Sequence, residues 1–336
     1  MFLHHPPLFS NETINSGDVE CKRLSLDWKP FGISCSSKFC NLYAITSFEP
    51  NYNNYIRIYH NHNDNKHNKV EVKIKYPQSS CMFSPTVTSQ DSDFLITSGD
   101  NLKIWKYDHN NIELFSEIKI NSTKDPVTCQ DWSTWDPNMA IVGATDGATV
   151  AVDLANEKIG ARILAHDYPI HDVKFYGPTP MFLTVSFDGS LRFFDLRNLE
   201  SSFIYYQAPL PLMRVSVSLM DETKVATFFK DSDYCIIIDI RKPGVPCGFC
   251  SFPGEKVTCL QWSKFERNVL FVSTDKGNIY QSYLNEDNIK MQSLLFYKID
   301  EPIESFVIGN EIAVSSKNHV NLIDFATSQQ RNELLF

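Results

Sequence analysis

Three residues whose side chains could together perform nucleophilic catalysis lie close in the sequence: His166, Ser186 and Asp188. A histidine oriented by a carboxylate can activate a serine hydroxyl, as in hydrolytic triads. No Gly-x-Ser-x-Gly turn, which holds such a serine in many hydrolases, accompanies them. The histidine instead precedes one apolar segment, the serine comes late in the next, and the aspartate lies in the following turn. This placement is typical of a network that satisfies buried polar groups, so we predict no catalytic residues.

Cys247 and Cys250 have the spacing of a pair of zinc ligands. A structural zinc site needs four ligands, usually with a second such pair. Cys235 and Cys259 are nearby in sequence, but they do not form that second pair. We therefore expect two thiols in a loop rather than a zinc or redox site, and we predict no metal and no cofactor.

His60, His62 and His67 lie among asparagine and lysine residues. We interpret the second half of the stretch from Asn51 to Asn68, starting at His60, as a solvent-exposed loop and not as a metal site. The sequence also contains no phosphate-binding glycine loop and no His-Glu-x-x-His motif. An enzyme is an alternative only if its polar groups converge from scattered positions.

Charge and hydropathy exclude other classes of function. The chain has 31 basic and 40 acidic residues, a net charge of −9, whereas domains that hold a phosphate backbone are usually basic. No segment approaches the roughly 18 uninterrupted apolar residues of a membrane-spanning helix, and the N-terminus does not read as a secretory signal. We expect a monomeric protein of the cytoplasm and nucleus, with its nine cysteines reduced and no direct contact with nucleic acid or membrane.

One pattern recurs along the chain. A short apolar segment ending in a bulky residue is followed by a second apolar segment, a tight turn and a third apolar segment. Intervals between successive first segments run from 42 to 55 residues. The first segments end at Trp28, Phe83, Trp132, Phe175, Val217, Trp262 and Phe306.

These segments are rich in Val, Ile, Phe and Thr and lie between turn residues, which favours strands over helices. A repeat of about 43 residues with four strands is the period of a β-propeller. We therefore predict an all-β, seven-bladed β-propeller over residues 19–336, preceded by an N-terminal arm at 1–18. That arm is a candidate for the outermost strand of the last blade. The expected blades lie near 19–62, 70–120, 125–160, 162–207, 210–252, 255–298 and 300–336.

The repeats resemble WD repeats. The fourth reads AHDYPIHDVKF…FLTVSFDGSLRFFDLR, with Phe194-Asp195 at the Trp-Asp position, so Phe194 joins the predicted network of His166. The second repeat has LKIWK, which keeps Trp105 but has Lys106 instead of aspartate. Several repeats lack the signature, such as the sixth with NIYQSYL.

A closer resemblance is to the Transparent Testa Glabra and Han-eleven family of WD-repeat scaffold proteins. It covers residues 90–250 best, and the run Asp-Leu-Arg-Asn-Leu-Glu at 195–200 is its most specific part. This sequence departs from the family in the sixth repeat and at the N-terminus, and resembles a divergent, compact member. The segments that carry the resemblance are TSGDNLKIWK (97–106), PVTCQDWSTWDPNMAIVGATD (126–146), LAHDYPIHDVKF (164–175), FDGSLRFFDLRNLESSFIYY (187–206) and PLMRVSVS…KVATFFKDSDYCIIIDIRKPGVP (211–246).

The resemblance implies a non-catalytic scaffold. Members of that family dock protein kinases of the dual-specificity tyrosine-regulated and homeodomain-interacting types, and in plants they assemble transcription regulators. Some members are substrate receptors of cullin-four ubiquitin ligases, in which a WD repeat ending in Asp-x-Arg contacts the adaptor. Arg197 in FFDLR and Arg241 in IIDIR match that signature. A kinase scaffold is our leading interpretation, with a ligase receptor and a propeller enzyme as alternatives.

Alignment with typical WD repeats also implies which residues face a partner. A closed propeller is rigid, so residues on one of its faces would form a surface that costs little ordering on binding. Aromatic residues or methionine there would be plausible anchors. The residues expected on that face are Thr128, His171, Phe187, Met213, Lys230 and Thr258.

Overall fold

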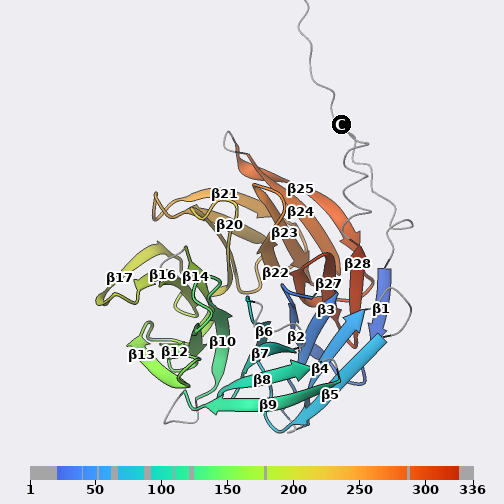
Figure 1. The fold of residues 1–336 in the computed structure, drawn as a ribbon. Coiled ribbons are helices and arrows are strands. Elements are labelled where there is room, and N and C mark those ends of the chain that lie inside the picture. The colour runs from blue at the N-terminus through green and yellow to red at the C-terminus, as the bar shows by residue number, and fades with distance from the viewer. Residues whose placement is uncertain are drawn as a thin grey trace, which may run out of the picture.

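The computed structural model describes residues 21–39, 41–50, 53–61, 67–86, 92–108, 110–120, 125–177, 180–285 and 288–324. Within these ranges the chain forms 28 β-strands and no helix (Figure 1). The prediction of an all-β propeller is thus confirmed in its class. The described residues accordingly include no helix long and apolar enough to cross a membrane.

The strands pair antiparallel in seven groups of four, which we call blades and number in chain order. Blades 1 and 2 consist of β2 (Pro30–Cys35), β3 (Leu42–Ser47), β4 (Asn54–Asn61) and β5 (His67–Ile74), and of β6 (Ser80–Phe83), β7 (Ser92–Ser98), β8 (Leu102–Asp108) and β9 (Asn111–Ile118). Blades 3 and 4 consist of β10 (Val127–Trp132), β11 (Met139–Ala144), β12 (Ala148–Asp153) and β13 (Lys158–Leu164), and of β14 (Ile170–Tyr176), β15 (Met181–Ser186), β16 (Ser190–Asp195) and β17 (Asn198–Gln207). Blades 5 and 6 consist of β18 (Leu212–Val217), β19 (Lys224–Phe229), β20 (Tyr234–Asp239) and β21 (Pro246–Ser251), and of β22 (Val257–Trp262), β23 (Val269–Thr274), β24 (Asn278–Asn285) and β25 (Asn288–Lys298). Blade 7 consists of β26 (Ile303–Ile308), β27 (Glu311–Ser316), β28 (His319–Asp324) and β1 (Cys21–Ser25).

The first strand of the described chain completes the last blade. Strand β1 pairs antiparallel with β28, with Leu24 opposite Val320 (Figure 1). This joint closes the ring and covers the free edge of β28, which would otherwise be open to pairing with other chains. The sequence suggested the arm at 1–18 as the closing strand, whereas the structure gives this role to Cys21–Ser25. Residues 1–18 themselves lie outside the described residues.

Blade 1 also differs from the expected range of 19–62. It begins at Pro30 and extends to Ile74, so His60 lies in β4 and His67 in β5, while His62 lies outside the described residues. The apolar segment that ends at Trp28 leads out of the closing strand and is not the inner strand of blade 1. The true inner strand, PFGISC, ends at Cys35 without a bulky residue, 48 positions before Phe83, which explains why the first interval looked too long.

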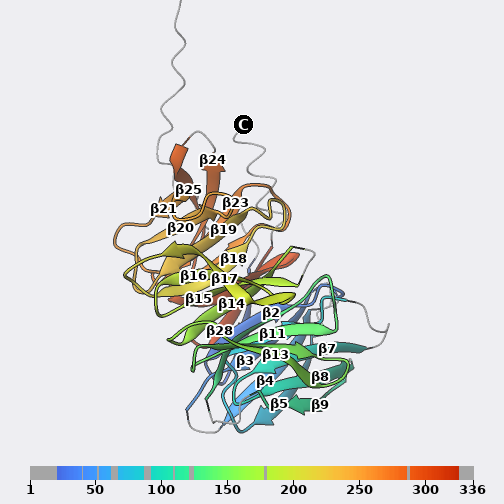
Figure 2. The same ribbon diagram turned by 90° about the vertical axis from the view of Figure 1, so that its left-hand side faces the viewer.

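The core lies between the blades. The first three strands of a blade are mostly buried, as in β19, where all six residues are buried, whereas the outermost strand β17 is exposed along most of its length. Trp262 of blade 6 packs with Phe228 of blade 5 in one such layer. Neighbouring sheets cover both faces of the second and third strands (Figure 2), so strands such as β11 (MAIVGA) and β23 (VLFVST) read as nearly continuous apolar runs.

Hydrogen bonds join the inner strands of neighbouring blades. At one repeated position of the inner strand, a side chain accepts a hydrogen bond from a backbone N–H of the next inner strand. The pairs are Ser34 with Phe83 (3.3 Å), Met82 with Trp132 (3.3 Å), Asp131 with Phe175 (2.9 Å), Ser216 with Trp262 (3.1 Å) and Gln261 with Ile308 (3.0 Å).

Two joints are made differently. In blade 4 the repeated position holds Lys174, whose ammonium bonds back to Asp131 at 2.8 Å. Asp172 replaces it as the acceptor and bonds the N–H of Val215 at 3.1 Å. Between blades 7 and 1, the hydroxyl of Ser305 donates to the carbonyl of Phe31 at 2.9 Å.

Blades 5 and 6 are further joined at their outer edges, where Phe249 of β21 pairs in parallel with Lys290 of β25. Because strands within each blade are antiparallel, the connection entering a blade and the connection between its second and third strands lie at the same end. We call that end the upper face and the opposite end the lower face.

Candidate functional site

The polar network of blade 4 surrounds His166, which is 1% exposed. Its Nδ1 lies 2.8 Å from Oδ2 of Asp188, and its Nε2 lies 2.7 Å from the hydroxyl of Thr184. A carboxylate can only accept, so Nδ1 carries the proton and Nε2 accepts from Thr184. Asp188 also accepts from Ser190 at 2.6 Å and from Arg192 at 3.2 Å. The turn between β15 and β16 is thus anchored to His166, and both ring nitrogens of that imidazole have hydrogen-bond partners.

Ser186 and Phe194 take other roles than the predicted one. The hydroxyl of Ser186 donates to the carbonyl of Pro169 at 3.0 Å and accepts from the N–H of Asp188 at 3.2 Å, and no bond to His166 is formed. Phe194 stacks on Phe182 with ring centroids 5.1 Å apart, in the core beside the network. The residue that the sequence analysis missed is Thr184, two positions before the serine.

The electrostatics of this network fit a structural role. Burial lowers the pKa of His166, although its hydrogen bond to Asp188 acts in the opposite direction. Burial would raise the pKa of Asp188, but hydrogen bonds from Ser190 and His166 hold that pKa below its usual value. The hydrogen bonds from Thr184 through His166 to Asp188 have the pattern of a catalytic triad, but Thr184 is 0% and His166 1% exposed, so a substrate cannot reach the hydroxyl in this arrangement.

Blade 2 contains a variant of the same network. The indole N–H of Trp105 donates to Thr97 at 2.9 Å, and the hydroxyl of Thr97 donates to the amide oxygen of Gln78 at 2.6 Å. Gln78 thus occupies the place of His166. In blade 4 the place of Trp105 is taken by Phe194, which has no N–H, so Thr184 bonds the histidine as Thr97 bonds the glutamine but receives no hydrogen bond from an indole.

The cysteines do not form a metal site. Cys247 and Cys250 lie in strand β21 and not in a loop, and Cys250 contacts Cys235 across the pairing of β20 and β21. Burial raises the pKa of Cys247, and Cys235 and Cys250 are fully buried. The described residues contain no group of three or more His, Cys, Asp or Glu side chains that could hold a metal ion.

Four residues meet on the upper face of blades 4 and 5, which we call the upper-face cluster: Tyr168, His171, Phe187 and Lys230. The ring of Phe187 lies 6.1 Å from that of Tyr168 and 6.0 Å, edge to face, from the imidazole of His171. The ammonium of Lys230 lies 6.0 Å from the centre of the Phe187 ring. Phe187 is 43% and Tyr168 is 54% exposed, which is high for aromatic residues. Tyr168 was not predicted, because it lies in a connection outside the repeated pattern.

Local geometry fixes this cluster. Phe187 stands on the tight turn between β15 and β16, where Gly189 has a φ of 77° and a Cβ would lie 2.2 Å from the carbonyl oxygen of Ala208. The N–H of Phe187 donates to the carbonyl of Pro169 at 3.0 Å. Nδ1 of His171 lies 2.7 Å from the carbonyl of Leu212 on the next blade. The backbone that carries Phe187 and the imidazole that meets its ring are therefore both fixed by hydrogen bonds.

The other residues expected on this face do not join the cluster. The hydroxyl of Thr128 donates to the carbonyl of Ile170 at 2.5 Å. Met213 packs against the core between blades 5 and 6. Thr258 bonds the hydroxyl of Ser273 at 2.9 Å.

The two Asp-x-Arg arginines lie after the third strands of their blades, at the lower face. Arg197 pairs with Asp195 at 2.6 Å and Arg241 pairs with Asp239 at 2.7 Å, while their side chains remain 59% and 64% exposed. Both guanidinium groups are thus held in similar geometry on adjacent blades and are open to solvent.

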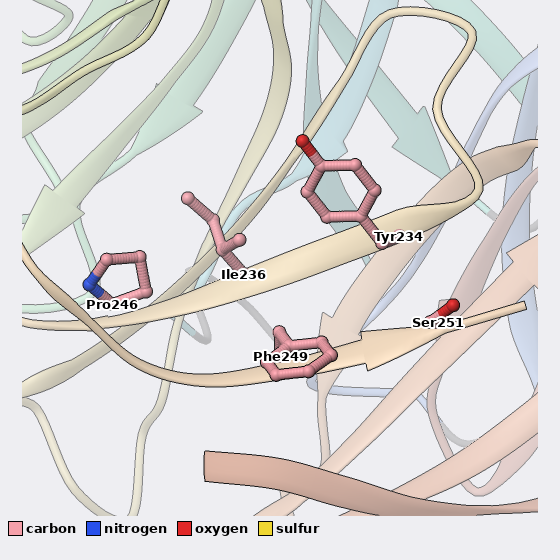
Figure 3. Close-up of a pocket in the computed structure, with 5 residues that line it drawn as sticks. All are labelled: Tyr234, Ile236, Pro246, Phe249 and Ser251. Carbon is pink, nitrogen blue, oxygen red and sulfur yellow. The ribbon is translucent and has the colours of Figure 1, made fainter.

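A cavity of about 380 Å³ lies on the side of blade 5 that faces blade 4 (Figure 3). Its lining includes no charged side chain and offers only hydroxyl and backbone groups for polar contact. It could hold an apolar side chain, but it provides no group for acid–base or metal chemistry. The residues that line it are Tyr234, Ile236, Pro246, Phe249 and Ser251.

Comparison with known proteins identifies the family. A DDB1- and CUL4-associated factor 7 homolog of Dictyostelium discoideum is 32% identical over 260 residues, covering 74% of this chain and 80% of that protein. The chain belongs to the WD-repeat family. WD repeat-containing protein YPL247C of Saccharomyces cerevisiae is 27% identical over 67% of this chain and 50% of its own length. No family model matches the sequence.

Solved WD-repeat-like structures agree with the fold. A chain in the crystal structure of the mitotic checkpoint complex superposes with a TM-score of 0.71 at 12% identity, covering 96% of this chain and 98% of that one. Chaetomium thermophilum Raptor gives a TM-score of 0.72 at 14% identity, over 90% of this chain and 28% of its own. At such identities the similarity shows the fold alone. The closer WD-repeat relatives support a protein-interaction scaffold.

We expect Asp188→Ala to lower the free energy of unfolding by about 1–3 kcal/mol, because it leaves buried donors on His166 and Ser190 without an acceptor. Chemical denaturation followed by tryptophan fluorescence would measure the loss. Asp146→Ala is the matched control, since Asp146 lies at the equivalent turn of blade 3 and pairs with the more exposed Arg162. Equal losses in the two variants would contradict the network.

We expect His166→Gln to weaken the dependence of stability on pH. The pKa of His166 is lower in the folded protein than the roughly 6.5 of an unfolded histidine, so the unfolded chain takes up a proton first as the pH falls. Wild type should therefore lose stability below about pH 6.5 at up to 1.4 kcal/mol per pH unit from this group. Unfolding at pH 7.5, 6.5 and 5.5 would show a shallower slope for the variant, and parallel slopes would refute the assignment.

Proposed function

We propose that this WD-repeat protein is a non-catalytic scaffold that docks a protein kinase of the dual-specificity tyrosine-regulated type on its upper face. The observation that carries the proposal is the upper-face cluster, in which the exposed rings of Phe187 and Tyr168 contact each other and stand on hydrogen-bonded backbone of a closed ring of sheets. Exposed aromatic residues that cost little to order are typical anchors of protein interfaces. The resemblance to the Transparent Testa Glabra and Han-eleven family supports a kinase as the partner.

Phe187→Ala should weaken binding of such a kinase at least tenfold without changing the melting temperature, because the ring is exposed and its removal opens no core cavity. Biolayer interferometry with the purified kinase would measure the dissociation constant. Trp135→Ala is the control, since Trp135 is 61% exposed but lies in the connection between β10 and β11, at the lower face. Equal binding by wild type and Phe187→Ala would remove the cluster from the interface, and no binding by wild type would refute the kinase.

A second candidate is a substrate receptor of a cullin-four ubiquitin ligase. The exposed arginines Arg197 and Arg241 favour it, since both stand at the lower face in the same ion-paired geometry. The description of the Dictyostelium relative, which names DDB1 and CUL4, supports it as well.

We expect the double variant Arg197→Ala/Arg241→Ala to lose binding to purified DDB1 while remaining folded, because exposed ion pairs contribute about 1 kcal/mol or less to stability. Size-exclusion chromatography of the mixed proteins would reveal the complex. Arg162→Ala, which removes an arginine at the upper end of blade 3, should leave the complex intact. A complex that persists in the double variant would exclude this docking mode.

A further inference from the structure

Two cationic side chains, one in the upper-face cluster and one on the strand that bonds its histidine, have no counter-charge. Arg214 lies on β18 and is only partly exposed, and its guanidinium makes no hydrogen bond or ion pair with any described residue. The ammonium of Lys230, apart from its position over Phe187, likewise has no acceptor within the described ranges. Arg214 is partly withdrawn from water without a partner, which costs free energy, whereas Lys230 is exposed and its ammonium is open to a ligand.

The charges of Arg214 and Lys230 both influence the imidazole of His171. Burial lowers the pKa of His171 first, and the charges of Arg214 and Lys230 lower it further. Nδ1 of His171 bonds the carbonyl of Leu212, so Nε2 is the nitrogen left for a ligand. The imidazole of His171 and the ammonium of Lys230 therefore both lie at the exposed ring of Phe187, and Arg214 follows two residues after Leu212, whose carbonyl bonds that imidazole.

The acidic groups nearby are already engaged. The two oxygens of Asp172 accept the backbone N–H groups of Val173 and Val215. Asp231, beside Lys230 in the turn, pairs with the ammonium of Lys256 at 2.8 Å. Neither carboxylate lies within ion-pair distance of Arg214 or Lys230 in the described structure, although Asp172 adds a negative charge to the region.

We propose that this surface binds an acidic peptide segment, with a carboxylate between Arg214 and Lys230 and a neighbouring apolar or aromatic side chain on Phe187 and Tyr168. The proposal rests on the scaffold function above and specifies the chemistry of the docked segment. Charge complementarity supports the proposal: the protein has a net charge of −9, yet Lys230, which has no acceptor among the described residues, lies over an exposed aromatic ring of the upper face.

The test begins with selection from a bead-displayed library of random ten-residue peptides, using the full chain as bait. We expect enriched peptides to carry Asp or Glu within two positions of Phe, Tyr, Trp or Leu. Their dissociation constants, measured by fluorescence anisotropy, should rise at least tenfold for Arg214→Gln and for Lys230→Gln. Lys256→Gln, which removes an exposed lysine already paired on the same face, should change them less than threefold.

A charge exchange makes the test independent of folding defects. Arg214→Glu should reject the acidic peptide and accept the same peptide with its carboxylate residue replaced by lysine. Selection of peptides without acidic residues, preference for phosphoserine peptides over carboxylate ones, or no recovery in the exchange would overturn the proposal. Kinase binding that needs Phe187 but not Arg214 or Lys230 would leave the scaffold function standing while removing this inference, so the two failures are distinguishable.

Discussion

The hydrogen bonds that join the inner strands hold the ring together. An inner strand pairs with a neighbour on one side only, so its other backbone N–H groups face the next blade and need an acceptor. A serine, methionine, aspartate or glutamine side chain supplies one at the same position in five blades, and Asp172 supplies it in blade 4. Because three of these bonds are buried and three are partly buried, opening a buried joint would leave a donor unsatisfied and cost more than the bond itself contributes.

The upper-face cluster depends on the irregular pairing at the start of the inner strands. The inner strands of blades 3, 4, 5 and 6 all show a register shift at their second residue, which is Thr128, His171, Met213 or Thr258. A bulge of this kind re-aims a side chain and ends regular pairing. In blade 4 the re-aimed residue, His171, meets the exposed ring of Phe187, over which Lys230 adds a positive charge. Blade 1 has a similar register shift, and there Phe31 meets the exposed ring of Phe48.

The repeated pattern in the sequence was enough to predict the fold class. It did not predict side-chain partners that depend on the register between strands. Apolar segments and turns of the Asp188-Gly189 kind were enough to predict the class of fold. The choice of Thr184 over Ser186 as partner of His166 depends on which residues of β15 share a face with the histidine, and that requires the pairing of β15 with β14. Arg214 was missed for a related reason, because an arginine inside a strand gives no sign that it lacks a partner.

The pairing of β1 with β28 has a consequence for how the protein folds during synthesis. Leu24 and Val320 are 296 positions apart, so β1 is synthesised long before the strand with which it pairs. Pairing over such a separation is slow, and an unpartnered strand is open to wrong associations meanwhile. Molecular chaperones that bind nascent chains would have their greatest effect on this segment. A chain truncated before β28 would leave the propeller open between β1 and blade 7.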